Sequence, residues 1–212
     1  MSARSGACLL ACLFFLIWSV PASRASDDWT FYPFDSLFKC DHTCAGTVFA
    51  GPLLRINLRP EAKKWETVLV GGTLSRILVE YRKDFDIEGE LGVAQRVGAL
   101  NEEEVWAAFY FRWKTFPWNN YITTTAAIST GVNYASAIDP YEVGQSRVGH
   151  GSNLLHYLAP EVTFALPQYP DWQLVARIHH RSGGALIWGD HGPFGGVYGA
   201  SQFFVMGVRH WF

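Results

Sequence analysis

A stretch of strict alternation near the C-terminal end of the chain constrains the fold most. Residues 172–182 read Trp-Gln-Leu-Val-Ala-Arg-Ile-His-His-Arg-Ser, which alternates with a period of two. Successive side chains of a β-strand point to opposite faces of its sheet. One face is therefore mostly apolar and ends in His180 and Ser182, whereas the other carries Arg177, His179 and Arg181. A soluble domain would turn these arginines to water, and a membrane barrel would turn them to its lumen and the apolar face to lipid.

The rest of the chain favours the barrel, because seven more segments have the character of strands. The eight predicted strands are residues 45–56, 66–81, 85–97, 105–114, 121–134, 154–166, 172–182 and 200–212. Longer and shorter connections alternate between them, and each strand is long enough to cross a bilayer at a tilt. We therefore predict an all-β fold, an eight-stranded antiparallel up-and-down transmembrane β-barrel, over residues 45–212.

The alternation also predicts which charges point into the lumen. In residues 85–97, one face carries Phe85, Ile87, Gly89, Leu91 and Val93, and the other carries Asp86, Glu88, Glu90 and Arg96. Arg112, Arg177 and Arg209 fall on inward faces too, so charges of both signs can pair where an unpaired charge would be costly. A pore is disfavoured, because side chains just fill the interior of an eight-stranded barrel.

Composition is compatible with a membrane barrel without proving it. Aromatic residues make up 16% of the chain, with nine Trp, and aromatic side chains gather at membrane interfaces. An aromatic-rich soluble β domain would explain the composition almost as well. The formal net charge of −2 offers no general reason to expect a nucleic-acid partner.

The first 25 residues have the features of a cleaved signal peptide. Arg4 precedes an apolar run, residues 7–20, that is too short to span a bilayer, and Ser23-Arg24-Ala25 is a small-x-small cleavage site. A lipoprotein box ending at Cys12 is the weaker interpretation, because it lies inside the apolar run. We predict export to the outer membrane of a Gram-negative-type bacterium, with residues 26–44 as a periplasmic N-terminal segment.

Cys40 and Cys44 remain after cleavage. An exported chain meets an oxidising compartment, so the spacing predicts a small-loop disulfide. A metal half-site is the alternative, but a structural zinc ion needs four ligands and no second cluster lies nearby in the sequence.

The C-terminal segment predicts a partner in assembly. Phe204, Met206, Val208, His210 and Phe212 are in phase, and the chain ends on an aromatic residue. The segment resembles the signal that outer-membrane barrels present to the barrel assembly machinery, although His210 stands where an aromatic residue such as Tyr is usual.

His180 and Ser182 are candidates for catalysis. They would face outer-leaflet lipid, and a neutral imidazole on the same strand face as a hydroxyl can act as its general base. A serine activated there would meet the acyl chains of lipopolysaccharide. The simpler interpretation is that His, Ser and Arg commonly stand at strand ends at the level of the lipid headgroups.

At these residues the chain resembles the lipid A 3-O-deacylase family of PagL-like outer-membrane barrels, most clearly over residues 155–212. That family removes an ester-linked acyl chain from lipid A, and its catalytic strand carries a His-x-Ser-Asn motif followed about a dozen residues later by a Glu that orients the His. The resemblance implies that His180 is the base and Ser182 the nucleophile. It implies no metal or organic cofactor, and it implies outer-membrane lipid and lipopolysaccharide as partners.

Two departures from the family pattern leave an alternative open. Gly183 replaces the Asn, and Phe194 stands a dozen residues on, with no Glu anywhere after Glu161. Asp190 is the one acid after Ser182 and could orient His180 if its glycine-rich loop folds back. The alternative is a non-catalytic structural or interaction barrel that has lost the orienting Glu, because an unoriented imidazole can hold the wrong tautomer.

Overall fold

The computed structural model describes residues 28–32, 39–54, 67–145, 149–184, 193–194, 197 and 200–212. The predicted signal peptide, residues 1–25, lies outside this part of the chain. Within the described residues no helix is long and apolar enough to cross a membrane, a finding that does not bear on crossing by strands.

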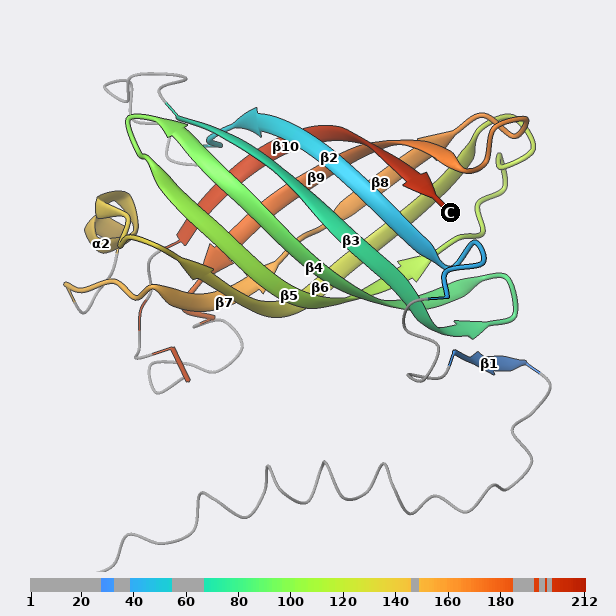
Figure 1. The fold of residues 1–212 in the computed structure, drawn as a ribbon, viewed down its shortest axis with the longest axis horizontal. Helices are drawn as coiled ribbons and strands as arrows, with labels where there is room; N and C mark the ends of the chain where they lie inside the picture. Colours follow the sequence, from blue (N-terminus) through green and yellow to red (C-terminus); the bar gives the residue numbers. More distant parts are fainter. Residues whose placement is uncertain are drawn as a thin grey trace, which may run out of the picture.

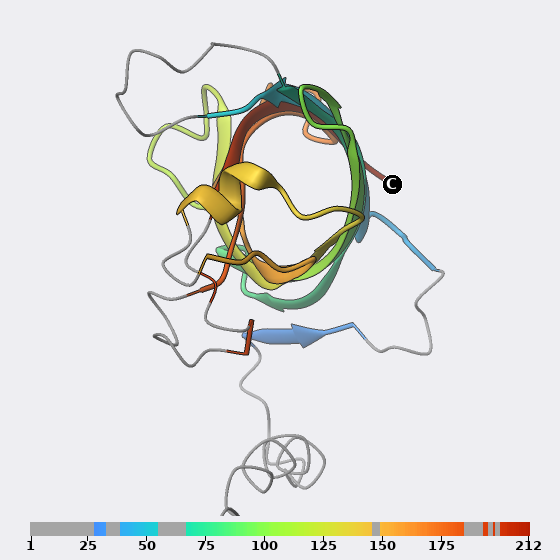
Figure 2. The same cartoon turned by 90° about the vertical axis from the view of Figure 1, so that its left-hand side faces the viewer.

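Antiparallel strands form a closed ring. The strands of the ring are β2 (Cys44–Pro52), β3 (Thr67–Tyr81), β4 (Phe85–Gly98), β5 (Glu102–Trp113), β6 (Thr123–Ala135), β7 (Leu154–Leu158), β8 (Glu161–Ala165), β9 (Trp172–Ser182) and β10 (Ala200–Trp211). Consecutive strands pair around the ring, with β7 and β8 both lying between β6 and β9, and β10 pairs with β2 to close the barrel (Figures 1 and 2). Because β7 and β8 occupy the same place in the ring, the wall has eight strands, and the predicted fold class is confirmed.

A proline divides the predicted strand 154–166 into β7 and β8. Pro160 has no N–H to give to a ladder, and the N–H of Ala159 donates instead to the hydroxyl of Ser129 at 2.7 Å. The pairing with β9 keeps one register across the gap, since Leu158 stands opposite His180 and Glu161 opposite Arg177. The two pieces therefore act as one strand of the wall.

The predicted connections need three corrections. Residues 102–104, predicted as loop, lie in β5, because Glu102 and Glu104 turn inward to pair with a buried arginine. A short helix, α2 (Pro140–Gln145), stands in the long connection after β6 and lies across one end of the ring (Figure 2). The first strand of the wall ends at Pro52 rather than residue 56.

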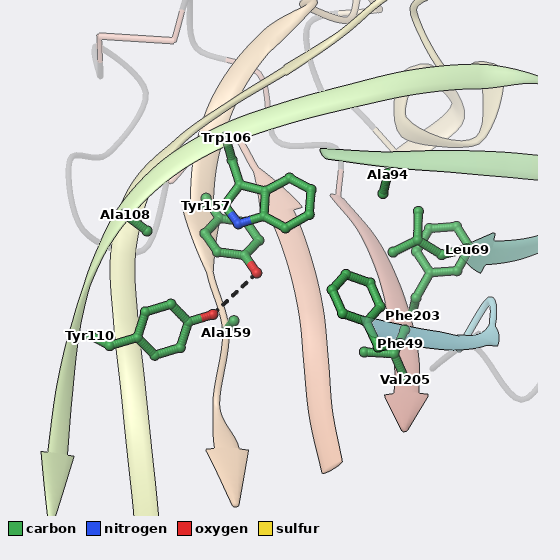
Figure 3. Close-up of a cluster of buried hydrophobic side chains, with 10 residues drawn as sticks. All are labelled: Phe49, Leu69, Ala94, Trp106, Ala108, Tyr110, Tyr157, Ala159, Phe203 and Val205. Carbon is green, nitrogen blue, oxygen red and sulfur yellow. Dashed lines mark hydrogen bonds between the residues drawn. The ribbon is translucent and has the colours of Figure 1, made fainter. Parts of the chain in front are cut away.

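The two faces of the wall differ as the alternation predicts. The lumen holds a buried apolar cluster that includes Phe49, Trp106, Tyr110, Tyr157 and Phe203 (Figure 3). The outward face is apolar and open to the surroundings, with large exposed side chains that include Val48, Leu74, Leu91, Phe109 and Met206. The outward phase of Phe204, Met206 and Val208 on β10 is confirmed, and recognition by the assembly machinery stays a prediction.

The inward charges pair as predicted. In the middle of the lumen the ion pairs are Arg112 with Glu88 and Glu161, Arg177 with Glu90 and Glu161, and Arg209 with Glu161. Arg177 lies 2.7 Å from Glu90 and 2.6 Å from Glu161, and all three side chains are fully buried. The lumen is thus filled by compensated charges and aromatic rings, which is the filled interior expected of eight strands.

A second charged cluster lies at the end of the barrel that carries α2. Asp139 and Glu142 come from the helix and the residue before it, and they reach Arg96 at 2.9 Å and Arg181 at 3.1 Å. The hydroxyl of Ser201 on β10 also donates to Glu142 at 2.7 Å. These contacts fasten the helix to the inner wall of the barrel.

The opposite end of the barrel carries the start of the described chain and the C-terminus (Figure 1). A short strand that the sequence did not predict, β1 (Trp29–Phe31), pairs with the last residues of β3, and Asp28 contacts Arg82 at 3.0 Å. Cys40 and Cys44 form a disulfide at the start of β2, which confirms the predicted pairing.

Candidate functional site

His180 and Ser182 lie on the outward side of β9, which is the face that the alternation predicts for them. Their neighbours His179 and Arg181 are fully buried in the lumen, whereas His180 and Ser182 are partly exposed on the outer side. The imidazole of His179 contacts Glu104 at 2.8 Å inside the barrel. The alternation therefore separates the two histidines, and His179 takes no part in an outward site.

Strand pairing brings further polar side chains to the same outer surface. Ser182 stands opposite His156 on β7, and His180 stands opposite Gln202 on β10. Thr130 on β6 lies next to this group, because its hydroxyl is 2.9 Å from Nε2 of His156. We call Thr130, His156, His180, Ser182 and Gln202 the outer polar patch. The patch spans the neighbouring strands β6, β7, β9 and β10 at the end of the barrel that carries α2.

His156 is the most enclosed member of the outer polar patch. Only 3% of it is exposed, although it shares the outward phase of Leu154 and Leu158 on β7. The ring of Phe194 lies near the imidazole, with 6.3 Å between the ring centroids. Phe194 itself packs with Val197 and Leu155 in a small buried cluster.

Gly183 lies against the backbone of Val197. A Cβ at Gly183 would stand 1.5 Å from the carbonyl oxygen of Val197. No larger residue fits there without moving the backbone, so the position that carries Asn in the family motif has no room for a side-chain amide in this chain.

Ser182 and His180 are neighbours without a hydrogen bond between them. The Oγ of Ser182 accepts the N–H of Gly184 at 3.3 Å, which leaves the hydroxyl proton available. Two residues apart on one strand, Ser182 and His180 have Cα atoms roughly 6.6 Å apart. Among the described residues no carboxylate hydrogen-bonds His180, and the predicted orienting acid, Asp190, lies outside the described residues.

The sequence did not single out His156. Its place two residues from both Leu154 and Leu158 indicated an outward direction. Its position opposite Ser182 depends on the register between β7 and β9, which no local pattern in the sequence specifies.

Comparison with known proteins gives similarity at the level of structure. No protein-family model matches the chain, and no significant match is found among curated protein sequences. Among solved structures, the barrel is similar to Neisserial surface protein A, with a TM-score of 0.50 and 13% identity over 82% of this chain and 99% of that one. Two others are the attachment invasion locus protein Ail of Yersinia pestis, with a TM-score of 0.39 and 9% identity over 80% and 96% of the two chains, and the outer membrane protein OprG of Pseudomonas aeruginosa, with a TM-score of 0.38, 9% identity and the same coverage.

The likeness to Neisserial surface protein A is one of fold. At 13% identity it carries no information about chemistry at the outer polar patch, so the resemblance to the lipid A deacylases stays a hypothesis based on His180 and Ser182. The chain has the fold of the eight-stranded outer-membrane β-barrel proteins.

Proposed function

We propose that this chain is an outer-membrane enzyme that hydrolyses an ester-linked acyl chain of lipid A at the outer polar patch. The observation that carries the proposal is a serine hydroxyl flanked by two imidazoles on a wall whose outward side chains are mostly apolar. Polar side chains facing lipid are costly and therefore call for a function. A lipid ester is the substrate that such a site would meet.

The proposed orientation places the outer polar patch in the outer leaflet. The N-terminal end of the barrel and the C-terminus lie together, and α2 lies at the other end, beside the last residues of β9 (Figure 1). With the chain ends in the periplasm, Ser182 stands at the height of the lipopolysaccharide acyl chains. This arrangement supports lipid A as the substrate over a phospholipid of the inner leaflet.

In the proposed reaction, Oγ of Ser182 attacks the ester carbonyl carbon while an imidazole takes its proton. The resemblance assigns that imidazole to His180. The ester C–O bond then breaks, the proton passes to the departing alkoxide, and water releases the acyl chain from Ser182 by the same steps in reverse. Gln202 is the side-chain amide of the patch and could stabilise the oxyanion in place of the missing Asn.

A second candidate function is a non-catalytic structural or interaction barrel. The observation in its favour is that no carboxylate in the described part of the chain hydrogen-bonds His180, whereas the deacylase mechanism uses an acid to orient its histidine. In this case the outer polar patch would serve as an interfacial belt.

Mass spectrometry of lipid A decides between the two functions. We expect lipid A from a Gram-negative host expressing the chain to lose one acyl chain, and a Ser182→Ala variant to leave lipid A intact. The matched control is His210→Ala, because His210 lies between Trp172 and Phe212 at the opposite end of the barrel. Unchanged lipid A with the native barrel folded in the outer membrane would favour the non-catalytic function.

A further inference from the structure

We propose that the outer wall binds one phospholipid of the inner leaflet, with a zwitterionic ethanolamine head group, at the end of the barrel that carries the C-terminus (Figure 1). This site is independent of the deacylase reaction and shares with it only the orientation of the barrel, with the chain ends in the periplasm. Three features support it: an apolar hollow in the wall, aromatic side chains at one edge of the hollow, and an acidic side chain beside them.

The hollow lies on the outer wall where β8, β9 and β10 run side by side. Its volume is about 360 Å³, which is within the range of about 300–1,000 Å³ that ligand sites occupy. Its lining residues include Phe164, Leu166, Tyr169, Trp172, Leu174 and Val208. We call it the β8–β9 hollow.

A row of apolar side chains crosses the β8–β9 hollow. Leu174 stands opposite Phe164 on β8 and opposite Val208 on β10. All three side chains are exposed, on a barrel that has the fold of an outer-membrane protein. The outer wall of such a barrel faces hydrocarbon, so an acyl chain is the occupant that this row would contact.

Aromatic side chains mark the edge of the hollow that is nearest the chain ends. Trp172 is the first residue of β9, and Tyr169 lies in the turn before it. The ring centroid of Trp172 is 4.3 Å from that of His210 on β10. Trp and Tyr gather at the level of lipid head groups, because part of each side chain is apolar and part is polar. Leu174, two residues further along β9, is then roughly 6.6 Å deeper, in the hydrocarbon.

The charges at this edge favour a zwitterionic head group over an anionic one. Asp171 precedes Trp172, and its side chain is 49% exposed. Its carboxylate lies 3.9 Å from Nδ1 of His42, which stands in the loop closed by the disulfide. Asp41 adds an exposed carboxylate in the same loop. An ammonium group can pair with Asp171, and the imidazole of His42 can donate to the phosphate, whereas an anionic head group would meet like charges.

A second hollow on the outer wall lacks these polar features. It lies over β2, β3 and β10, has a volume of about 480 Å³, and is lined by residues that include Val48, Ala50, Val70 and Met206. Among its described lining residues there is no charged residue, no Trp and no Tyr. It can accept an acyl chain but offers no group for a head group, so we assign the bound phospholipid to the β8–β9 hollow.

The test is native mass spectrometry of the folded barrel, released from nanodiscs that hold equal amounts of an ethanolamine phospholipid, a glycerol phospholipid and lipid A. We expect the native barrel to retain one ethanolamine phospholipid. Leu174→Trp should lower this retention about tenfold, because the larger ring occupies the space of the acyl chain. The matched control is Leu74→Trp, since Leu74 is a similarly exposed leucine that lines neither hollow, and it should retain the lipid as the native barrel does.

Asp171→Asn tests the head group. It should bring the preference for the ethanolamine over the glycerol phospholipid from about threefold to near one, because a single exposed charge contributes modestly. Asp84→Asn is the control, since Asp84 lies between β3 and β4 at the same end of the barrel and hydrogen-bonds Thr115. It should leave the preference unchanged.

Photo-crosslinking keeps the test independent of the folding of any variant. An ethanolamine phospholipid with a diazirine on its acyl chain should label residues 162–174 of the native barrel several-fold more than residues 85–97, which also present apolar side chains outward.

The outcomes that overturn the proposal are distinct. Equal retention by Leu174→Trp and the native barrel, or labelling spread evenly around the wall, would show general contact with lipid. Barrels released as lipid-free dimers would show that a second copy covers the hollow. Preferential retention of lipid A or of the glycerol phospholipid would overturn the assigned lipid. None of these readouts depends on hydrolysis of lipid A, so failure of the proposed function is seen separately.

Discussion

Single buried charges of the lumen illustrate how much each residue depends on its partners. Arg177 contacts Glu90 and Glu161, and its guanidinium also lies over the ring of Tyr110 at 5.0 Å. A charge taken out of water is tolerated only where other charges and hydrogen bonds replace the solvent. The arginines of the middle lumen therefore hold the acids of β4 and β8 in place as much as the acids hold them.

We expect Arg177→Met to destabilise the barrel by about 3–5 kcal/mol, because Glu90 and Glu161 would lose a partner in a buried site. The measurement is urea unfolding of the barrel folded into lipid bilayers. Arg82→Met is the control: Arg82 pairs with Asp28 at the surface, where an ion pair contributes little, and we expect no measurable change. Equal stability of Arg177→Met and the native chain would show that the lumen pairs do not support the barrel.

Among the elements, α2 is a short helix held mainly by charge. Glu142 is fully buried and faces Arg181 on β9, Arg96 on β4 and Ser201 on β10, with Asp139, Glu104 and His179 in the same cluster. Burial raises the pKa of Glu142 above its ordinary value near 4.5, and the contacts with Arg181, Ser201 and Arg96 offset this only in part. The docked helix therefore binds a proton at Glu142 more tightly than an undocked helix does.

Because protonation of Glu142 favours the docked helix, we expect α2 to dock more firmly at low pH. The stabilising effect is lost as pH rises from the ordinary glutamate range through the raised pKa. Hydrogen exchange at the N–H of Val143, which donates to the carbonyl of Asp139, should show protection that falls with pH after correction for intrinsic rates. Glu142→Gln should remove this dependence, and the exposed Glu103→Gln should keep it. A pH dependence that survives in Glu142→Gln would contradict the assignment.

The elements also show where sequence reasoning succeeds and fails. Residues 172–182 were predicted as a strand with the bounds that β9 has, because alternation over eleven residues is a local signal. The start of β5 was missed because Glu102 and Glu104 look like loop residues until Arg96 is placed opposite them.

His156 was missed for a related reason. His156 matters because it stands directly opposite Ser182 on the paired strand. The pairing of β7 with β9 is set by the closed ring, and the local sequence does not show it. β1 and α2 were missed because three and six residues are too short to show a period.

For the whole molecule, the outward face of the barrel determines which environment favours the fold, water or hydrocarbon. Large apolar side chains stand exposed around the wall, with Leu74 and Leu91 directly opposite each other on β3 and β4. Exposed apolar area of this extent is unfavourable in water and favourable in hydrocarbon. The charges of the chain are instead collected in the lumen and at the two ends.

A charged side chain on the outer wall should therefore destabilise the barrel more when it lies nearer the middle of the bilayer. Leu91 is at the middle of β4 and Val97 is near its end, and both are outward and at least half exposed. We expect Leu91→Arg to destabilise the barrel in a bilayer by about 2–4 kcal/mol and Val97→Arg by about 0–1 kcal/mol, because an arginine near the end can reach the headgroups. Reversible unfolding in urea from lipid vesicles measures both. Equal costs at the two positions would show that β4 does not cross the hydrocarbon layer, since in water an exposed leucine and an exposed valine tolerate arginine alike.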